Sequence, residues 1–102
     1  MNKVIKRGKV AVLISGGFGA GWSTWIHDDK ILFDPVIVDA VQKKLPFSDV
    51  ESYLKKEYPN KSFHGYNKLC IVWVKVGERF RINEYDGAEE LILEKDHYWI
   101  TA

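Results

Sequence analysis

Ser15-Gly16-Gly17-Phe18-Gly19-Ala20-Gly21-Trp22-Ser23-Thr24-Trp25 follows directly on the apolar run Val10-Ala11-Val12-Leu13-Ile14, and the rest of the chain is organised around this junction. The apolar run predicts a strand that is buried on both faces or lies at the centre of a sheet. Four glycines stand between positions 16 and 21, and a tryptophan follows them directly. Because glycine loses the most conformational freedom on folding, such a cluster is tolerated where the backbone takes positive φ or lies close to a ligand or another strand.

Two helices are predicted after this loop. Asp34-Pro35 combines an N-capping aspartate with a proline at the first helical position, and an apolar face continues to Leu45. Ser48-Asp49-Val50-Glu51 has the capping-box pattern, which predicts a second helix from Asp49 to Tyr58. Between the loop and the first helix, Ile31-Leu32-Phe33 is expected to form a short strand or a packed extended segment.

Strands dominate the rest of the chain. The segments rich in β-branched and aromatic residues run from Leu69 to Val76, Arg79 to Tyr85, Ala88 to Glu94 and His97 to Thr101. Asp86-Gly87 between two of them is a strong signal for a two-residue hairpin turn. The order β-loop-α-α-β-meander predicts an α+β fold, a mainly antiparallel β-sheet with two short helices on one face, in a single domain over residues 1–102.

Composition narrows the classes of function. The chain has 15 basic and 14 acidic residues, and this balance argues against a protein that coats nucleic acid. No apolar run approaches the roughly 20 residues of a membrane-spanning helix, so we expect no membrane association. The basic N-terminus leads into only a short apolar run, which argues against a secretory signal. The single cysteine, Cys70, excludes an intramolecular disulfide and fits a cytoplasmic location.

The glycine spacing overlays a phosphate-binding pattern. Gly16 and Gly21 followed by Trp22-Ser23 match GxxxxGK[ST], except that tryptophan replaces the lysine that contacts the terminal phosphates. Hydrolysis of a nucleoside triphosphate is therefore not expected. A glycine-rich turn can still direct several backbone N–H groups at an anion. The equal alternative is a structural close approach of two backbone segments.

The two tryptophans offer a surface for stacking. Trp22 and Trp25 beside glycine backbone would make a pocket for a nucleobase, with stacking of about 1–3 kcal/mol per base. The alternative is that both rings fill the core. Ser23 and Thr24 would hydrogen-bond phosphate or ribose, or cap a turn.

Two arginines add positive charge. Arg79 and Arg81 share the polar face of a predicted strand, where they would clamp an anion or pair with Glu89 or Glu90 across the hairpin.

Residues for catalysis are sparse. The three histidines lie far apart without a metal-ligand spacing, and no serine or cysteine stands in a nucleophile motif. We therefore expect a protein that is not an enzyme and that holds no metal or cofactor.

The whole sequence resembles a family of small tailed-phage and prophage proteins that carry a Gly-Ala-Gly-Trp-Ser-Thr-Trp motif. The segments that carry the resemblance are Lys9 to Leu13, Gly19 to Trp25, Leu32 to Pro35, Arg79 to Gly87 and Trp99 to Ala102. The resemblance implies a phage origin. Compact phage proteins of this size include sponges that sequester nucleotide signals of bacterial defence, usually as oligomers with ligand at subunit interfaces.

These observations favour a phage anti-defence protein that binds and sequesters a nucleotide-type immune signal without turning it over. We expect a homo-oligomer with a small phosphorylated ligand. The predicted ligand-binding residues are Gly17, Gly19, Gly21, Trp22, Ser23, Thr24, Trp25, Arg79 and Arg81. The alternative is a protein–protein inhibitor or adaptor that uses the aromatic residues as interface anchors, and a third possibility is a small nucleotide-processing enzyme.

Overall fold

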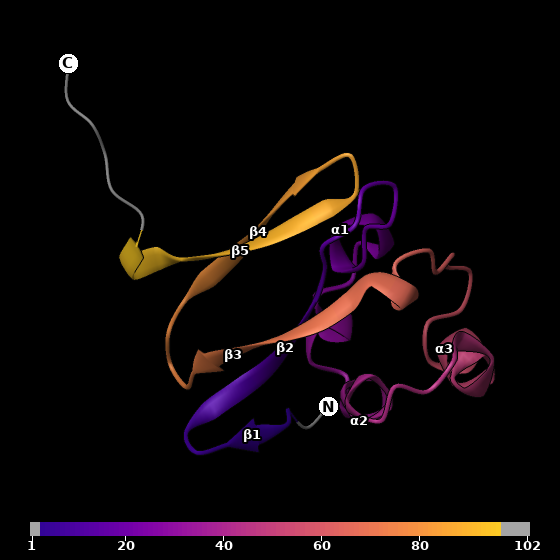
Figure 1. Cartoon of the computed structure of the whole chain (residues 1–102), viewed down its shortest axis with the longest axis horizontal. Coiled ribbons are helices and arrows are strands. Elements are labelled where there is room, and N and C mark those ends of the chain that lie inside the picture. Colours follow the sequence, from indigo (N-terminus) through magenta and orange to yellow (C-terminus); the bar gives the residue numbers. More distant parts are fainter. Residues whose placement is uncertain (1–2, 97–102) are drawn as a thin grey trace.

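A computed structural model describes residues 3–96 and shows an α+β fold (Figure 1). Five antiparallel strands form two sheets, and short helices join them. In chain order the elements are β1 (Ile5–Lys6), β2 (Lys9–Ser15), α1 (Ser23–Ile26), the 3₁₀ helix η1 (Asp29–Phe33), α2 (Pro35–Gln42), η2 (Phe47–Asp49), α3 (Glu51–Glu57), η3 (Tyr66–Lys68), β3 (Leu69–Lys75), β4 (Phe80–Tyr85), β5 (Ala88–Leu93) and η4 (Glu94–Asp96). Within residues 3–96, no helix is long and apolar enough to span a bilayer.

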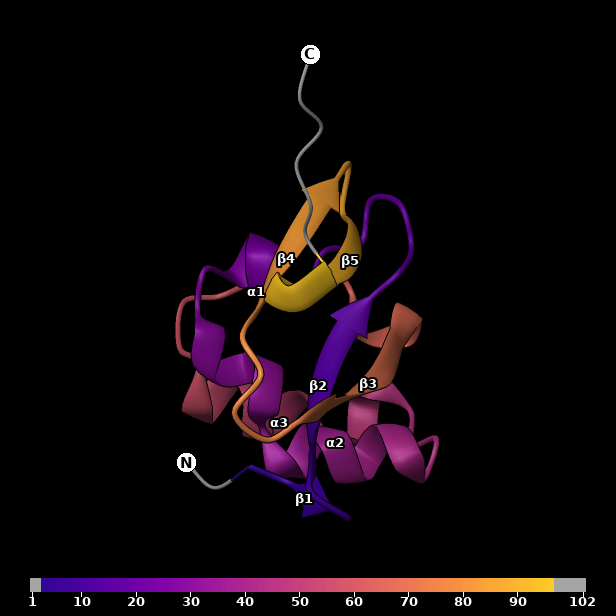
Figure 2. The ribbon, with the colours of Figure 1, turned by 90° about the vertical axis from the view of Figure 1, so that its left-hand side faces the viewer.

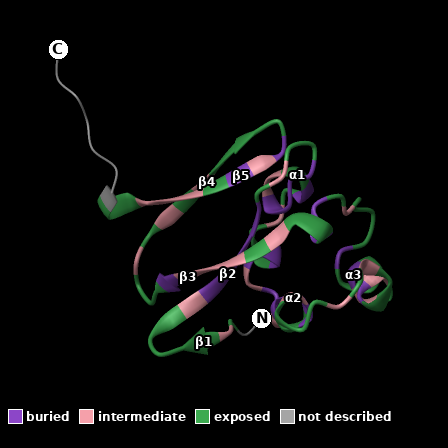
Figure 3. Cartoon of the chain, viewed as in Figure 1, coloured by how far each residue is buried: buried purple, intermediate pink, exposed green. Residues whose placement is uncertain are grey.

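The first sheet has the order β1-β2-β3, and β2 pairs with β3 along its whole length, from Lys9↔Lys75 to Ser15↔Leu69. Alternate residues of β2 face opposite sides of this sheet. Ala11 and Leu13 pack against α2 and α3 on one side, while Val12 and Ile14 pack against the β4–β5 hairpin on the other. Figure 3 shows β2 buried between these layers. The prediction of a strand that is buried on both faces is confirmed.

The predicted start of the first helix is confirmed. The side chain of Asp34 accepts hydrogen bonds from the N–H groups of Val36 and Ile37 at 2.9 and 3.4 Å, with Pro35 at the first helical position. The same buried carboxylate accepts the hydroxyls of Tyr53 and Tyr58. This network joins the beginning of α2 to α3.

The second helix starts differently from the prediction. Residues 47–49 form a 3₁₀ turn, and α3 begins at Glu51 with Val50 as an N-cap that makes no side-chain capping bond. The predicted capping box is therefore not formed. Likewise, residues 31–33 belong to η1 and are not extended.

The predicted meander is divided between two sheets. Gly77, at φ +90°, and the Glu78 N–H bond to the Lys75 carbonyl turn the chain after β3. The chain then crosses to the other face of the first sheet, where Phe80 and Ile82 pack beside Val12. Burial of this apolar face replaces continued pairing with β3. The predicted strand at 97–101 lies outside the described residues.

The hairpin turn between β4 and β5 is confirmed. Asp86 and Gly87 have φ values of +49° and +89°, and Tyr85 pairs with Ala88 on either side of them. Positive φ at both central residues is the type I′ geometry that suits the twist of a hairpin. The turn lies beside the glycine-rich loop, because the N–H of Gly19 donates to the carbonyl of Asp86.

Candidate functional site

The glycine-rich loop is organised around one carboxylate of the protein itself. Glu89 of β5 is only 6% exposed, and its two oxygens accept four hydrogen bonds from the loop. Oε1 accepts the N–H of Ser15 at 2.9 Å. Oε2 accepts the N–H of Trp22 at 2.9 Å, and both the N–H (3.1 Å) and the hydroxyl (2.6 Å) of Thr24. Loop N–H groups therefore do bind an anion, and that anion is the Glu89 side chain.

Close packing against the glycine-rich loop explains three glycines, two of which lie outside the loop. A Cβ on Gly65 would stand 2.4 Å from the carbonyl oxygen of Ala20, and one on Gly87 would stand 2.5 Å from the Ala20 nitrogen. A Cβ on Gly21 would stand 2.5 Å from Cγ of Trp25. Backbone segments therefore approach the loop closely at Gly65 and Gly87, whereas a Cβ on Gly16 or Gly19 would meet nothing within 4 Å.

The two tryptophans have different environments. Trp22 has no exposed surface, its indole N–H donates to the Ile31 carbonyl at 3.4 Å, and its ring packs beside Phe63. Trp22 is thus a core residue and not part of an exposed stacking surface. Trp25 lies within α1 and is 39% exposed. The side chains diverge because Trp22 precedes the helix, at φ −107° and ψ −102°.

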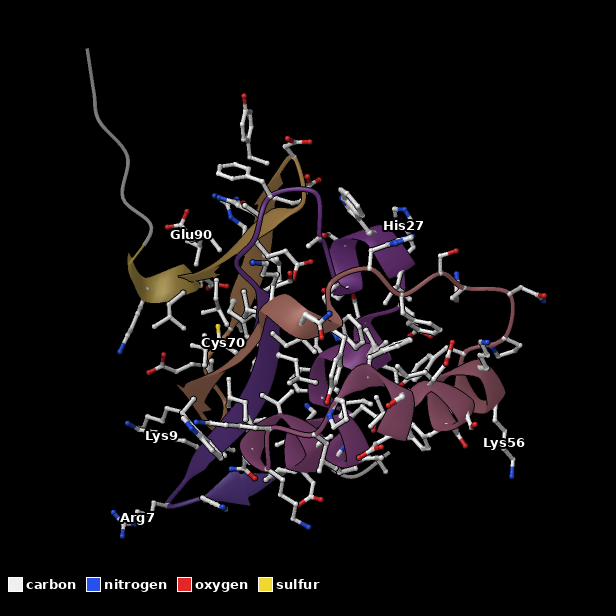
Figure 4. The ribbon with its side chains drawn as sticks, turned by 45° about the vertical axis from the view of Figure 1, so that its right-hand side comes forward. Arg7, Lys9, His27, Lys56, Cys70 and Glu90 are labelled. Atoms are coloured by element: carbon white, nitrogen blue, oxygen red, sulfur yellow. The ribbon has the colours of Figure 1, made fainter. Side chains whose placement is uncertain are left out.

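A hollow of about 540 Å³ lies beside Trp25. The indole packs on Gly21 and forms one wall, with the His64 ring edge-on to it at 6.4 Å between ring centroids. His27, the residue that ends α1 at φ +60°, contributes a second imidazole and points outward in Figure 4. Further polar groups come from Asn60, Lys61 and Ser62 of the loop after α3, and from Glu84 of β4.

A second hollow, of about 380 Å³, lies on the other side of Thr24. Ser23, Thr24 and Arg81 line it together with apolar residues of η1 and β4. Arg79 lies elsewhere, because its Nε pairs with Glu94 at 3.2 Å. The cross-strand ion pair predicted for Arg79 thus exists with a different glutamate.

The remaining predicted contacts lie outside both hollows. Gly17 packs against the side chain of Lys68, and Gly19 donates its N–H to Asp86. The nine predicted residues therefore do not converge on one site. Thr24 and Trp25 meet at the first hollow, and Ser23, Thr24 and Arg81 meet at the second.

An exposed aromatic pair stands where the loop meets the hairpin turn. Phe18 is 71% exposed and Tyr85 is 77% exposed, and the two rings meet edge to face with 6.3 Å between centroids. Edge-to-face contact is a favoured aromatic geometry. Neither ring reaches the core, so this pair is a feature of the surface.

Sequence reasoning did not identify the groups that surround Trp25. Lys61 and His64 stand in a loop that carries no motif, more than thirty positions along the chain from Trp25. Only the fold brings them to α1. Among residues 3–96, no group of three or more His, Cys, Asp or Glu side chains is placed to hold a metal ion.

Comparison of the chain with protein-family models, with curated proteins and with solved structures finds no match to any of them.

Proposed function

We propose that the protein binds a small phosphorylated ligand of the nucleotide type in the hollow beside Trp25, without chemical turnover. The observation that carries this proposal is a partly exposed indole forming the wall of a hollow that also presents Lys61, His27 and His64. A volume of about 540 Å³ lies within the range of small-molecule sites, roughly 300–1,000 Å³.

Each part of such a ligand has a matching group. A base would stack on the Trp25 indole, a contact that tolerates any base because all have a π-face. The Lys61 ammonium would attract phosphate, and the imidazoles of His27 and His64 would donate N–H hydrogen bonds to it. Glu84, whose carboxylate accepts the Gly87 N–H at 2.8 Å, would accept a sugar hydroxyl. Positive charge would therefore come from Lys61, and not from the glycine loop or Arg79.

The proposal includes a biological role, which is sequestration of a nucleotide signal. In a tailed phage, a protein that retains a nucleotide signal lowers the free concentration available to the defence effector. Such a sponge needs affinity and abundance but no catalytic group.

Calorimetric titration with AMP, ADP-ribose and cyclic di-AMP tests the proposal. We expect at least one probe to bind. Trp25→Ala should lower the affinity for that probe about 5- to 150-fold, which corresponds to a stacking loss of about 1–3 kcal/mol. Lys61→Ala should lower the affinity for the same probe and reduce the dependence of that affinity on salt concentration. Phe18→Ala, which removes a more exposed ring outside the hollow, is the control and should bind as wild type. Absence of binding by all three probes, or unchanged binding to Trp25→Ala, would contradict the proposal.

A second candidate function rests on the Phe18–Tyr85 pair. Two large rings exposed by more than 70% on adjacent turns are suited to anchor a protein partner. The turns are held in place by the Gly19–Asp86 and Glu89 hydrogen bonds, so little ordering would accompany binding. A stoichiometric host partner that is lost with Phe18→Ala and Tyr85→Ala, and retained with Trp25→Ala, would favour this function over ligand sequestration.

A further inference from the structure

The strand β3 has an open edge. One side of β3 pairs with β2 through all seven residues, and no strand lies beyond its other side in the part of the chain between residues 3 and 96 (Figure 2). The outward N–H and C=O groups of such an edge are a template for pairing with another strand.

Apolar side chains along this edge are only partly covered. Ile71, Val72 and Trp73 are half-buried, although their paired neighbours in β2 are fully buried. Val72 belongs to the face covered by the β4–β5 hairpin, and Ile71 and Trp73 belong to the face covered by the helices. The two layers therefore bury residues 11–15 of β2 and leave apolar surface of β3 open at the edge.

Features that normally block edge pairing are missing from β3. The strand Leu-Cys-Ile-Val-Trp-Val-Lys contains no proline, and its register with β2 runs without a bulge. Its one charged residue, Lys75, stands at the end. Long apolar edges of this kind associate unless something occupies them.

We propose that β3 pairs antiparallel with β3 of a second copy of this chain, about a two-fold axis at Val72. This pairing would join two three-stranded sheets into one continuous sheet and would form a self-complementary interface.

The second copy fits because the strand is complementary to its own reverse. With Val72 at the axis, Ile71 faces Trp73 of the second copy, and Lys75 faces Leu69. No two lysines of β3 oppose each other, and aromatic–β-branched pairs stabilise antiparallel strands. The pairing is independent of the ligand proposed for the Trp25 hollow, because β3 contributes no residue to that hollow.

Sedimentation equilibrium tests the pairing. We expect a particle of twice the 11.8 kDa chain mass for wild type, and a monomer with an unchanged circular dichroism spectrum for Val72→Arg, which places two like charges at the axis. The matched control Ile5→Arg alters an exposed β-branched residue of β1, at the opposite edge of the same sheet, and should remain dimeric. A monomeric wild type, or a Val72→Arg protein that is still dimeric, overturns the proposal.

The only cysteine gives a test that needs no destabilising change. Cys70 is exposed on β3 and is labelled in Figure 4. With four residue steps of about 3.4 Å along the strand and about 5 Å across the pair, its Cα should stand about 14–15 Å from Cα of the symmetry-related Cys70. A nitroxide on Cys70 should show dipolar coupling for this range, and excess unlabelled chain should abolish it. Absence of coupling overturns the proposal. The proposal is also overturned if the β3 amides are protected from hydrogen exchange at every protein concentration and this protection is lost when residues 97–102 are deleted.

Discussion

Replacement of Glu89 by glutamine tests whether this carboxylate holds the glycine-rich loop in place. The substitution keeps the size of the side chain but leaves one acceptor oxygen where there were two. The Oε2 side makes three of the four bonds, so the amide oxygen should take that side and turn its NH₂ group toward the Ser15 N–H. Two donors would then face each other in a buried position.

The cost follows from hydrogen-bond energies. An orphaned buried N–H costs about 1–3 kcal/mol, and a bond to a charged group exceeds a neutral one by roughly 1 kcal/mol. With partial relaxation of the loop, Glu89→Gln should lower the free energy of unfolding by about 3 kcal/mol. For a chain of this length that is a fall in the melting temperature of roughly 12–24 °C.

Urea denaturation followed by circular dichroism measures this free energy directly. Glu90→Gln is the matched control, because Glu90 is the next residue of β5 and is exposed. It should change the free energy of unfolding by no more than about 0.5 kcal/mol. If the two variants unfold with the same free energy, the hydrogen bonds of Glu89 do not stabilise the loop.

Three further predictions concern the same fold. Gly87→Ala should lower the free energy of unfolding by more than about 1 kcal/mol, because φ of Gly87 is +89° and the added Cβ would collide with Ala20. Gly16→Ala is the control, because its added Cβ would meet nothing within 4 Å, and it should leave the free energy of unfolding in a urea titration unchanged. Trp22→Ala should lower the free energy of unfolding by about 3–5 kcal/mol through loss of a fully buried indole, and a stable variant that merely loses ligand would contradict its place in the core. Burial, and then hydrogen bonding to Asp34, raise the pKa values of Tyr53 and Tyr58 in the folded protein. The protonated hydroxyls therefore stabilise the folded state below the ordinary tyrosine pKa of about 10, and this contribution to the free energy of unfolding is lost as the pH rises above that value. The absorbance at 295 nm should therefore reach its full tyrosinate value only when alkali unfolds the protein, and complete ionisation of the folded chain would refute this.

Local signals were sufficient for several elements. The apolar run before the glycines predicted β2, Asp34-Pro35 predicted the start of α2, and Asp86-Gly87 predicted the hairpin turn. Each of these depends on neighbouring residues, whose preferences are visible in the sequence. The division of the meander into two sheets was not predicted, because it depends on whether Phe80 and Ile82 bury more surface against the sheet face or beside β3.

The site was harder to predict because its contacts are long-range. Glu89 bonds to Ser15 across 74 positions, and no local pattern distinguishes it from Glu90. The sequence suggested an anion at the loop, and the structure shows that a side chain supplies it. Trp22 and Trp25 are equivalent in the sequence and differ only once the start of α1 is known.

The most direct test of the proposed function is mass spectrometry of the small molecules released on denaturation of protein purified from a host with active nucleotide-signalled defence. We expect a phosphorylated nucleotide in wild type and in the Phe18→Ala control, and its loss from Trp25→Ala. An empty wild-type fraction, or an equal amount released from Trp25→Ala, would contradict sequestration in the hollow beside Trp25.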